Sequence, residues 1–255
     1  MKKTYSKISG FEKNMILGTG FSDVNLTQVL EYIREIVKKD HKNRYFVTPN
    51  PELVMLAKGD TRYKRVLNDA DLALTDGVGV LLAGKALKTP VGERITGVDL
   101  IENVCKDNVD QPITVGFLGG GSGVAEITAE CLLKKYPGLK IGLVHEGNPD
   151  TSTLGVINEK TKNEKLDILF VAFGSPKQEL WIAENLQSLP AKITIGVGGA
   201  FDFISGKVKR APKWMQDFGL EWFFRLLNQP WRIKRQFSLI IFIFLVLKEL
   251  IAKKK

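Results

Sequence analysis

The sequence predicts an α/β protein with a mostly parallel, doubly wound sheet, helices on both faces and a helical C-terminal appendage. Short apolar runs alternate with amphipathic segments through residues 1–206. Each run is rich in Val, Ile, Leu or Phe, as parallel strands buried on both faces are. This alternation is typical of right-handed β-α-β crossovers and of Rossmann-like sheets. Residues 207–255 differ from this core because they are basic and aromatic-rich.

Seven apolar runs are the expected strands of the core. They are Met15–Leu17, Tyr45–Thr48, Leu72–Thr75, Thr114–Leu118, Lys140–His145, Ile168–Ala172 and Ile193–Val197. The expected helices between them are Leu26–Lys38, Glu52–Lys58, Val78–Ala86, Val98–Lys106, Ser122–Tyr136, Ser152–Lys162 and Lys177–Leu189. Polar or glycine-rich loops follow five of the strands. Because ligands of open α/β sheets bind beyond the carboxyl ends of the strands, we expect these loops to form one crevice.

Histidine and cysteine are scarce in this sequence. It contains two His and two Cys. This number excludes a disulfide scaffold and a Cys-rich zinc site, and it makes a multi-histidine metal centre improbable. The cysteines are expected to be core residues in a reducing compartment.

The positive charge is concentrated at one end of the chain. Residues 207–255 contain twelve Lys or Arg and three Asp or Glu, which accounts for the whole net charge of +9. Residues 1–206 are neutral. The sequence therefore predicts a neutral catalytic core, 1–206, and a basic appendage, 207–255, that meets a polyanion such as a membrane surface or a phosphorylated ligand.

The longest apolar run lies inside this basic appendage. Phe237–Leu247 has ten apolar residues out of eleven, with Arg235 and Lys248 near its ends. As a helix it would be about 16 Å long, against about 30 Å of hydrocarbon in a bilayer. We therefore expect it to lie in the membrane interface or against a partner subunit, and not to span the membrane.

An acidic residue directly follows one expected strand. Asp76 is ionised at neutral pH with an ordinary pKa and faces the expected crevice, so it suits a general base. Its alternative role is to cap the following helix. The nearby Asp69-Ala70-Asp71 matches an acidic metal motif, but it precedes its strand. We expect it to be a solvated turn at the opposite end of the sheet.

Other crevice residues have a chemistry that suits phosphates and sugars. Gly119, Gly120 and Gly121 lie between a strand and a helix, where backbone N–H groups can hold a phosphate, or where close packing needs glycine. Arg94 suits a diphosphate or an ion pair with an acid. Gln178 opens a helix and is a hydrogen-bonding candidate for a sugar or a phosphate.

Three arginines of the appendage have helical spacing. Arg225, Arg232 and Arg235 are related as i, i+7 and i+10, which places them on one helical face if Pro230 does not bend the chain far. Beside an apolar run they suit a lipid-linked phosphate. The alternatives are a solvated face or contact with lipid headgroups.

Several ordered blocks resemble the WecG/TagA/CpsF glycosyltransferase family over about residues 14 to 236. They are Thr48–Glu52, Leu74–Gly79, Glu93–Leu100, Gly116–Gly120, Ala172–Glu179 and Gly196–Asp202, followed by Arg210-Ala211-Pro212 and the aromatic segment around Arg225. Several blocks in matching order are more specific than any single motif.

The resemblance implies an inverting, metal-independent transferase that needs no cofactor and no metal site. TagA-like members move N-acetylmannosamine from its UDP donor to the 4-hydroxyl of N-acetylglucosamine on undecaprenyl diphosphate, forming the β-1,4 linkage unit of wall teichoic acid. The resemblance also implies a peripheral protein on the cytoplasmic face of the cell membrane. The active-site positions it carries over are Asp76 as the catalytic base, with Thr48, Asn50, Arg94 and Gln178. The appendage positions are Arg225, Arg232 and Arg235, which would close over the acceptor diphosphate and contact the membrane.

Alternatives remain open at this point. Other members of the family use N-acetylmannosaminuronic acid or glucuronic acid in antigen or exopolysaccharide synthesis. The alternating pattern also suits an NAD-dependent oxidoreductase, although the glycine spacing departs from its fingerprint. Nucleic-acid binding is disfavoured because the basic residues are interleaved with a bulky apolar run. The apolar run also leaves a homo-oligomer open.

Overall fold

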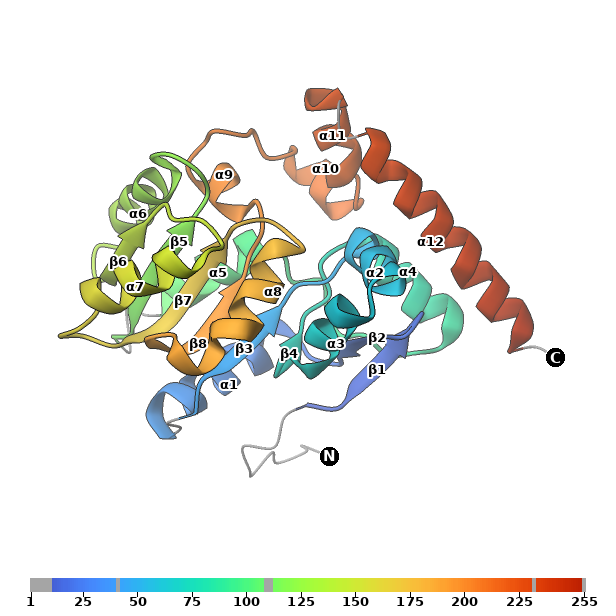
Figure 1. The fold of residues 1–255 in the computed structure, drawn as a ribbon. Helices are drawn as coiled ribbons and strands as arrows, with labels where there is room; N and C mark the ends of the chain where they lie inside the picture. Colours follow the sequence, from blue (N-terminus) through green and yellow to red (C-terminus); the bar gives the residue numbers. More distant parts are fainter. Residues whose placement is uncertain (1–10, 40–41, 108–111, 231–232, 254–255) are drawn as a thin grey trace.

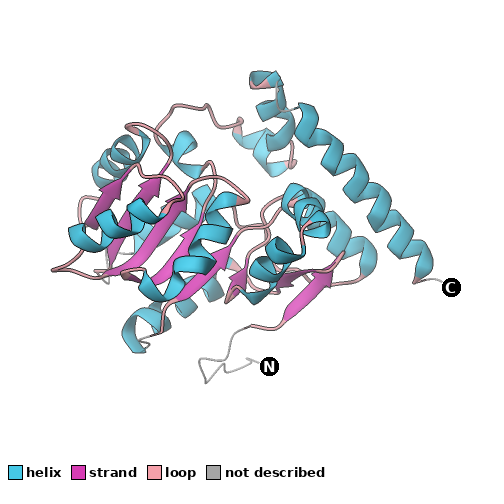
Figure 2. Ribbon diagram, in the orientation of Figure 1, coloured by secondary structure: helices cyan, strands magenta, loops and turns pink. Residues whose placement is uncertain are grey.

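The core of the computed structural model is a six-stranded sheet between two layers of helices (Figure 1, Figure 2). The structure describes residues 11–39, 42–107, 112–230 and 233–253. The strands are β3 (Arg44–Val47), β4 (Leu72–Ala73), β5 (Thr114–Gly119), β6 (Lys140–His145), β7 (Leu166–Ala172) and β8 (Ala191–Gly196). They lie in the order β4-β3-β8-β7-β5-β6, and every pair is parallel. The predicted Rossmann-like α/β fold is confirmed.

Alternate residues of each strand face opposite helix layers, which explains why the strands are apolar throughout. Phe46 and Phe170 pack in one core cluster, whereas Val47 and Val171 pack in the other. The first cluster includes residues of α1 (Leu26–Lys39), α5 (Gly97–Asp107), α6 (Val124–Lys135) and α9 (Ala200–Ile204). The second includes residues of α2 (Pro51–Gly59), α3 (Thr61–Asp69), α7 (Thr151–Lys160) and α8 (Lys177–Asn185), which the short 3₁₀ turn Leu186–Ser188 follows.

The first predicted strand does not join the parallel sheet, so that expectation is wrong. β1 (Lys13–Ile16) and β2 (Thr19–Ser22) form a separate antiparallel hairpin. Its two turn residues, Leu17 and Gly18, have φ values of 50° and 85°. Positive φ at both turn positions matches the right-handed twist of the flanking strands.

Helix α3 is missing from the sequence expectation because its apolar signal is weak. Within it, only Tyr63 and Leu67, four residues apart, are buried. Asp60 caps the helix by accepting hydrogen bonds from the backbone N–H groups of Arg62 and Tyr63, at 2.8 and 3.0 Å. Four of its other seven residues are charged, so no apolar run marks it in the sequence.

The appendage forms three helices, α10 (Lys213–Asp217), α11 (Glu221–Asn228) and α12 (Ile233–Ala252). The predicted boundary at residues 206 and 207 falls between α9 and α10. α12 has 20 residues and is about 30 Å long, so it extends the predicted apolar run at both ends. It lies along α2 and α4 (Val78–Leu87), as Figure 1 shows. Among the described residues, no helix is long and apolar enough to cross a membrane.

Candidate active site

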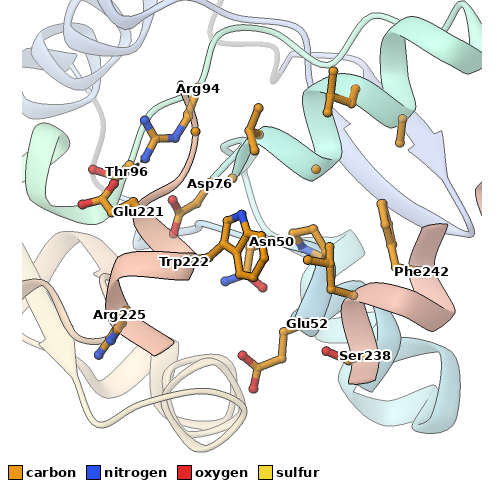
Figure 3. A pocket seen from close by; sticks show the side chains of 18 of the residues that line it. Asn50, Glu52, Asp76, Arg94, Thr96, Glu221, Trp222, Arg225, Ser238 and Phe242 are labelled. Carbon is orange, nitrogen blue, oxygen red and sulfur yellow. Dashed lines mark hydrogen bonds and ion pairs between the residues drawn. The ribbon is translucent and has the colours of Figure 1, made fainter. Parts of the chain in front are cut away.

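A cavity of about 620 Å³ lies between the carboxyl ends of β3, β4 and β8 and the appendage (Figure 3). Its polar lining residues include Asn50, Asp76, Arg94 and Thr96 from the core and Glu221 and Arg225 from α11. Glu52 of α2 and Ser238 of α12 also line it. The loops after neighbouring parallel strands converge at one edge of a sheet, which brings the core residues together. The appendage then closes this edge from outside, so the cavity belongs to both parts of the chain.

Asp76 lines this cavity, and a backbone hydrogen bond fixes its position. Its N–H donates to the carbonyl of Pro49 at 3.1 Å, which continues the pairing of β3 with β4 beyond the strands. Gly77, and not Asp76, precedes the first residue of α4, and no side chain caps that helix. The alternative role of Asp76 as a helix cap is therefore wrong.

The Asp76 carboxylate is unusual because it is half-buried and makes no hydrogen bond or ion pair with the described part of the chain. Burial raises the pKa of Asp76 to about 7. Arg94 and Arg225 favour its charged form, whereas Glu221 and Asp99 oppose it. A carboxylate with a pKa near neutral pH and open space before it suits a general base.

Arg94 connects the core to the appendage through an ion pair. Its Nη2 donates to Oε2 of Glu221 at 2.6 Å, and its Nη1 donates to the carbonyl of Gln216 at 3.4 Å. Both side chains are about one-fifth exposed. The predicted alternative of an ion pair with an acid is confirmed, and the acid is Glu221 rather than the neighbouring Glu93.

A second arginine extends this ion pair into a four-residue network, which we call the clasp: Arg94, Glu221, Arg210 and Asp99. Arg210 Nε donates to Oε1 of Glu221 at 3.1 Å, and its Nη2 donates to Oδ1 of Asp99 at 2.8 Å. Although burial opposes its charge, hydrogen bonds from Arg210 and Thr96 hold the pKa of Asp99 below its ordinary value. The clasp joins α11 to the start of α5 beside Asp76.

Asn50 lines the cavity, but Thr48 does not. Asn50 Oδ1 accepts a hydrogen bond from the N–H of Leu53 at 3.1 Å and so caps α2. Thr48 is buried, and its hydroxyl donates to the carbonyl of Gly196 at 3.2 Å, which ties the end of β3 to β8. The structure thus places Asn50 at the cavity wall and Thr48 behind it.

Gln178 is buried and connects two loops. Its Oε1 accepts from the N–H groups of Gly174 and Gly198 at 3.2 and 3.1 Å, and its Nε2 donates to Oε1 of Glu179 at 2.7 Å. It does not line the cavity in this structure. Its contacts fix the loops after β7 and β8, and its predicted contact with a ligand stays a prediction.

Replacing Gln178 with alanine is expected to lower the free energy of unfolding by about 2–4 kcal/mol, because two partly buried N–H groups lose their acceptor. Urea unfolding measures this loss. The exposed Gln187 provides the control, and Gln187→Ala is expected to leave stability unchanged. Loss of turnover by Gln178→Ala at unchanged stability would instead indicate direct contact with a substrate.

The glycine-rich loop after β5 lies apart from the cavity. Gly119 and Gly120 have φ values of 103° and 85°. A Cβ on Gly119 would come 2.8 Å from the carbonyl carbon of Ala172, and one on Gly120 would come 2.9 Å from Val124. Close packing therefore explains both glycines. Gly121 is exposed, and the predicted phosphate contact of the three residues stays a prediction.

Arg225, one of the three predicted arginines, lines the cavity. Its guanidinium carbon lies 5.0 Å from the centre of the Phe203 ring. The condition for one shared helical face is not met, because α11 ends at Asn228, before Pro230, and Arg235 belongs to a separate helix, α12. Arg232 lies outside the described residues. The backbone of Arg235 belongs to α12, but its side chain also lies outside them.

The sequence expectation missed Glu221, Trp222, Arg210 and Asp99 as residues of this site. Glu221 is one of three acids in the basic appendage, and that exception was the available signal. Figure 3 shows Asp76, Arg94, Glu221 and Trp222 gathered around the same space. Their meeting depends on the docking of α11, which no local pattern specifies.

Asp69 and Asp71 lie at the opposite end of the sheet, as expected. Asp71 accepts from the N–H of Tyr45 at 3.0 Å and pairs with Arg44 at 2.8 Å, both at the start of β3. The expectation of a solvated turn is wrong for Asp71, because its carboxylate is largely buried in this ion pair. Within the described ranges, no group of three or more His, Cys, Asp or Glu side chains is placed to hold a metal ion.

Comparison with known proteins identifies relatives over nearly the whole chain. The model of the glycosyl transferase WecG/TagA/CpsF family matches residues 14–255. An N-acetylglucosaminyldiphosphoundecaprenol N-acetyl-beta-D-mannosaminyltransferase of Bacillus spizizenii is 33% identical over 228 residues, covering 89% of this chain and 88% of the relative. A protein of the same name from Staphylococcus aureus is 32% identical over 253 residues, covering 99% and 98%.

Proposed function

The chain belongs to the glycosyl transferase WecG/TagA/CpsF family, and we propose that it transfers N-acetylmannosamine from UDP-N-acetylmannosamine to N-acetylglucosamine on undecaprenyl diphosphate. The new bond is β-1,4, and the product is the linkage unit of wall teichoic acid. The names of the relatives support this acceptor and this sugar. The observation that carries the proposal is the unpaired carboxylate of Asp76 in a cavity that also presents Arg94 and Arg225.

The chemistry of the proposed transfer is a single displacement with inversion. The 4-hydroxyl of the acceptor attacks the anomeric carbon of the donor as the bond to UDP breaks. Asp76 takes the hydroxyl proton, and a pKa of about 7 suits this task at neutral pH. The cavity holds acceptor and donor in line, which replaces an encounter in solution by a fixed geometry.

The leaving UDP needs positive charge or N–H donors near its diphosphate. Arg225 lines the cavity and Arg94 lies beside Asp76, so two guanidinium groups contribute positive charge near the proposed diphosphate. We therefore propose that transfer is independent of metals and cofactors, as the resemblance implies. Initial rates are expected to be unchanged in excess EDTA, and a strict requirement for added Mg²⁺ or Mn²⁺ would contradict this.

A panel of donors tests the proposed function. Purified protein is incubated with N-acetylglucosaminyl-diphosphoundecaprenol and UDP-N-acetylmannosamine, UDP-N-acetylmannosaminuronic acid or UDP-glucuronic acid. Mass spectrometry of the lipid product then identifies the sugar added. We expect transfer from UDP-N-acetylmannosamine. Transfer of a uronic acid alone would assign the protein to antigen or exopolysaccharide synthesis. A separate fluorescence titration measures NADH binding, and NADH binding without sugar transfer would favour the oxidoreductase.

We also propose that the protein acts at the cytoplasmic face of the cell membrane, to which the appendage attaches it peripherally. α12 has an apolar outer face, with Ile240, Phe244 and Ile251 between 61% and 65% exposed. Such a face beside a basic segment suits the interface of an anionic bilayer. A lipid-linked acceptor makes that location useful.

Phe244→Glu is expected to reduce flotation with anionic liposomes about tenfold, because it removes a phenyl ring from the proposed lipid contact. Ile127→Glu on α6 is the control, since Ile127 is also an exposed apolar residue and α6 lies on the opposite side of the molecule from α12 (Figure 1). Analytical sedimentation of the same proteins tests whether a second copy of the chain, instead of lipid, covers this face. If Phe244→Glu dissociates a dimer and leaves flotation intact, the face is a subunit interface instead.

A further inference from the structure

The cavity has two chemically different ends. The end described above is polar and contains Asp76, Arg94 and Arg225. The other end lies between two helices and is lined by Leu82, Ala83 and Ala86 of α4 and by Ile243, Val246 and Leu247 of α12. A single cavity thus joins a charged end, lined by three carboxylates (Glu52, Asp76 and Glu221) and two guanidinium groups, to an apolar groove.

The groove persists although α12 is firmly packed on the core. Phe242 and Val246 are 1% and 6% exposed and belong to a cluster that includes Val80 and Leu87 of α4. Figure 3 shows Phe242 projecting from α12 toward α4. By contrast, Leu82, Ile243 and Leu247 are between 50% and 60% exposed, although they line the same cavity. The two helices therefore meet along part of their length and leave an open apolar space beside the contact.

A ligand that fills both ends must be an amphiphile. Its head must be polar or anionic to lie near the arginines, and the part next to it must be a flexible apolar chain to lie between α4 and α12. Exposed apolar side chains that line a cavity together are typical of a binding groove rather than of a solvated face. A UDP-sugar has no apolar part, so the donor fits only the polar end.

We propose that the groove between α4 and α12 binds the first isoprene units of the polyprenyl diphosphate acceptor. This proposal rests on the proposed function, because it assigns the groove to the acceptor of that reaction. The diphosphate then lies toward Arg225 and the sugar toward Asp76. The rest of the chain leaves along the outer face of α12, where Ile240 and Phe244 are exposed. The groove is thus continuous with the surface proposed to contact lipid.

Two adjacent residues of α4 provide a matched pair of variants. Ala86 is exposed and lines the groove, whereas Lys85 is exposed and does not. Ala86→Trp is expected to fill the groove, and Lys85→Trp adds the same ring outside it. On α12, Ile243→Glu and Ile241→Glu form a second pair of the same kind, because both residues are exposed and Ile243 lines the groove whereas Ile241 does not.

The test compares farnesyl diphosphate with inorganic diphosphate by isothermal titration calorimetry of the full chain. We expect the wild type to bind farnesyl diphosphate at least tenfold more tightly than diphosphate. That preference should fall about tenfold in Ala86→Trp and Ile243→Glu and stay unchanged in Lys85→Trp and Ile241→Glu. Equal binding of the two ligands by the wild type, or equal losses within each matched pair, would overturn the proposal.

A turnover measurement separates this proposal from the proposed function. N-acetylglucosamine diphosphate esters with a farnesyl or a methyl group are compared as acceptors in detergent. The ratio of their kcat/KM values is expected to fall about tenfold in Ala86→Trp and to keep its wild-type value in Lys85→Trp. Groove-dependent binding of farnesyl diphosphate without sugar transfer to any acceptor would support the groove and refute the transferase assignment.

Discussion

Asp76→Asn is expected to lower kcat about a thousandfold and to leave the fold intact. Asparagine has nearly the same shape as aspartate but does not accept the acceptor proton, and a positioned general base contributes about 10²–10⁴-fold to a rate. The measurement is the initial rate of sugar transfer to the lipid acceptor at saturating donor. Near-wild-type turnover by Asp76→Asn would remove Asp76 from the chemistry.

The same variant is expected to be more stable than the wild type at alkaline pH. The folded state raises the pKa of Asp76 from 3.8 to about 7, so between these values the folded protein holds a proton that the unfolded chain has lost. Stability therefore falls as the pH rises through this window. Asparagine removes this effect, and the gain above pH 7 is up to about 4 kcal/mol.

Urea unfolding at pH 5 and pH 8 checks whether the stability of the wild type falls relative to that of Asp76→Asn as the pH rises. The advantage of Asp76→Asn over the wild type is expected to be larger at pH 8, because the buried carboxylate is fully ionised only there. A variant that is inactive and also less stable at both pH values has simply lost its fold, and its inactivity then says nothing about a base.

The clasp is expected to set the pH dependence of catalysis. Glu221 raises the pKa of Asp76 and Arg94 lowers it. Glu221→Gln removes the negative charge, so the pKa of Asp76 falls and the acid limb of the kcat profile moves to lower pH. Arg94→Gln removes the positive charge, so the limb moves to higher pH. The pH dependence of kcat is measured for both variants, and the two displacements are opposite.

Both clasp variants are also expected to lose activity at neutral pH, about tenfold or more in kcat/KM. Each removes the partly buried Arg94–Glu221 ion pair from the clasp, which weakens the docking of α11 against the core. Glu184→Gln is the control. It breaks an exposed ion pair between Glu184 on α8 and Arg62 on α3. Displacement of the two acid limbs in the same direction would show that the clasp acts through structure alone.

The elements that sequence predicted well are those whose signal is local. The run Tyr45–Thr48 is apolar because alternate residues of β3 face two buried helix layers, and the structure has a strand at Arg44–Val47. Met15–Leu17 has the same local signal, yet it forms a hairpin with β2. An apolar run thus predicts a strand but does not identify its partner, which is a long-range choice.

The same distinction applies to the cavity. Asp76 and Asn50 follow strands directly, so the rule for the carboxyl ends of parallel strands places them correctly. Glu221 belongs to α11 and lies about 145 residues after Asp76 in the sequence. No local sequence pattern predicts its ion pair with Arg94. Gln178 follows a strand too, but its amide is fully used by two backbone N–H groups and Glu179.

The anomeric configuration of the product tests most directly whether Asp76 deprotonates the acceptor for a single displacement. NMR spectroscopy of the disaccharide formed by the wild-type protein reads this configuration against that of the donor. Inversion, giving a β-linked N-acetylmannosamine, is the expected result, because one displacement reverses the anomeric centre. Retention of the donor's configuration would contradict a single displacement and, with it, Asp76 as the base of this reaction.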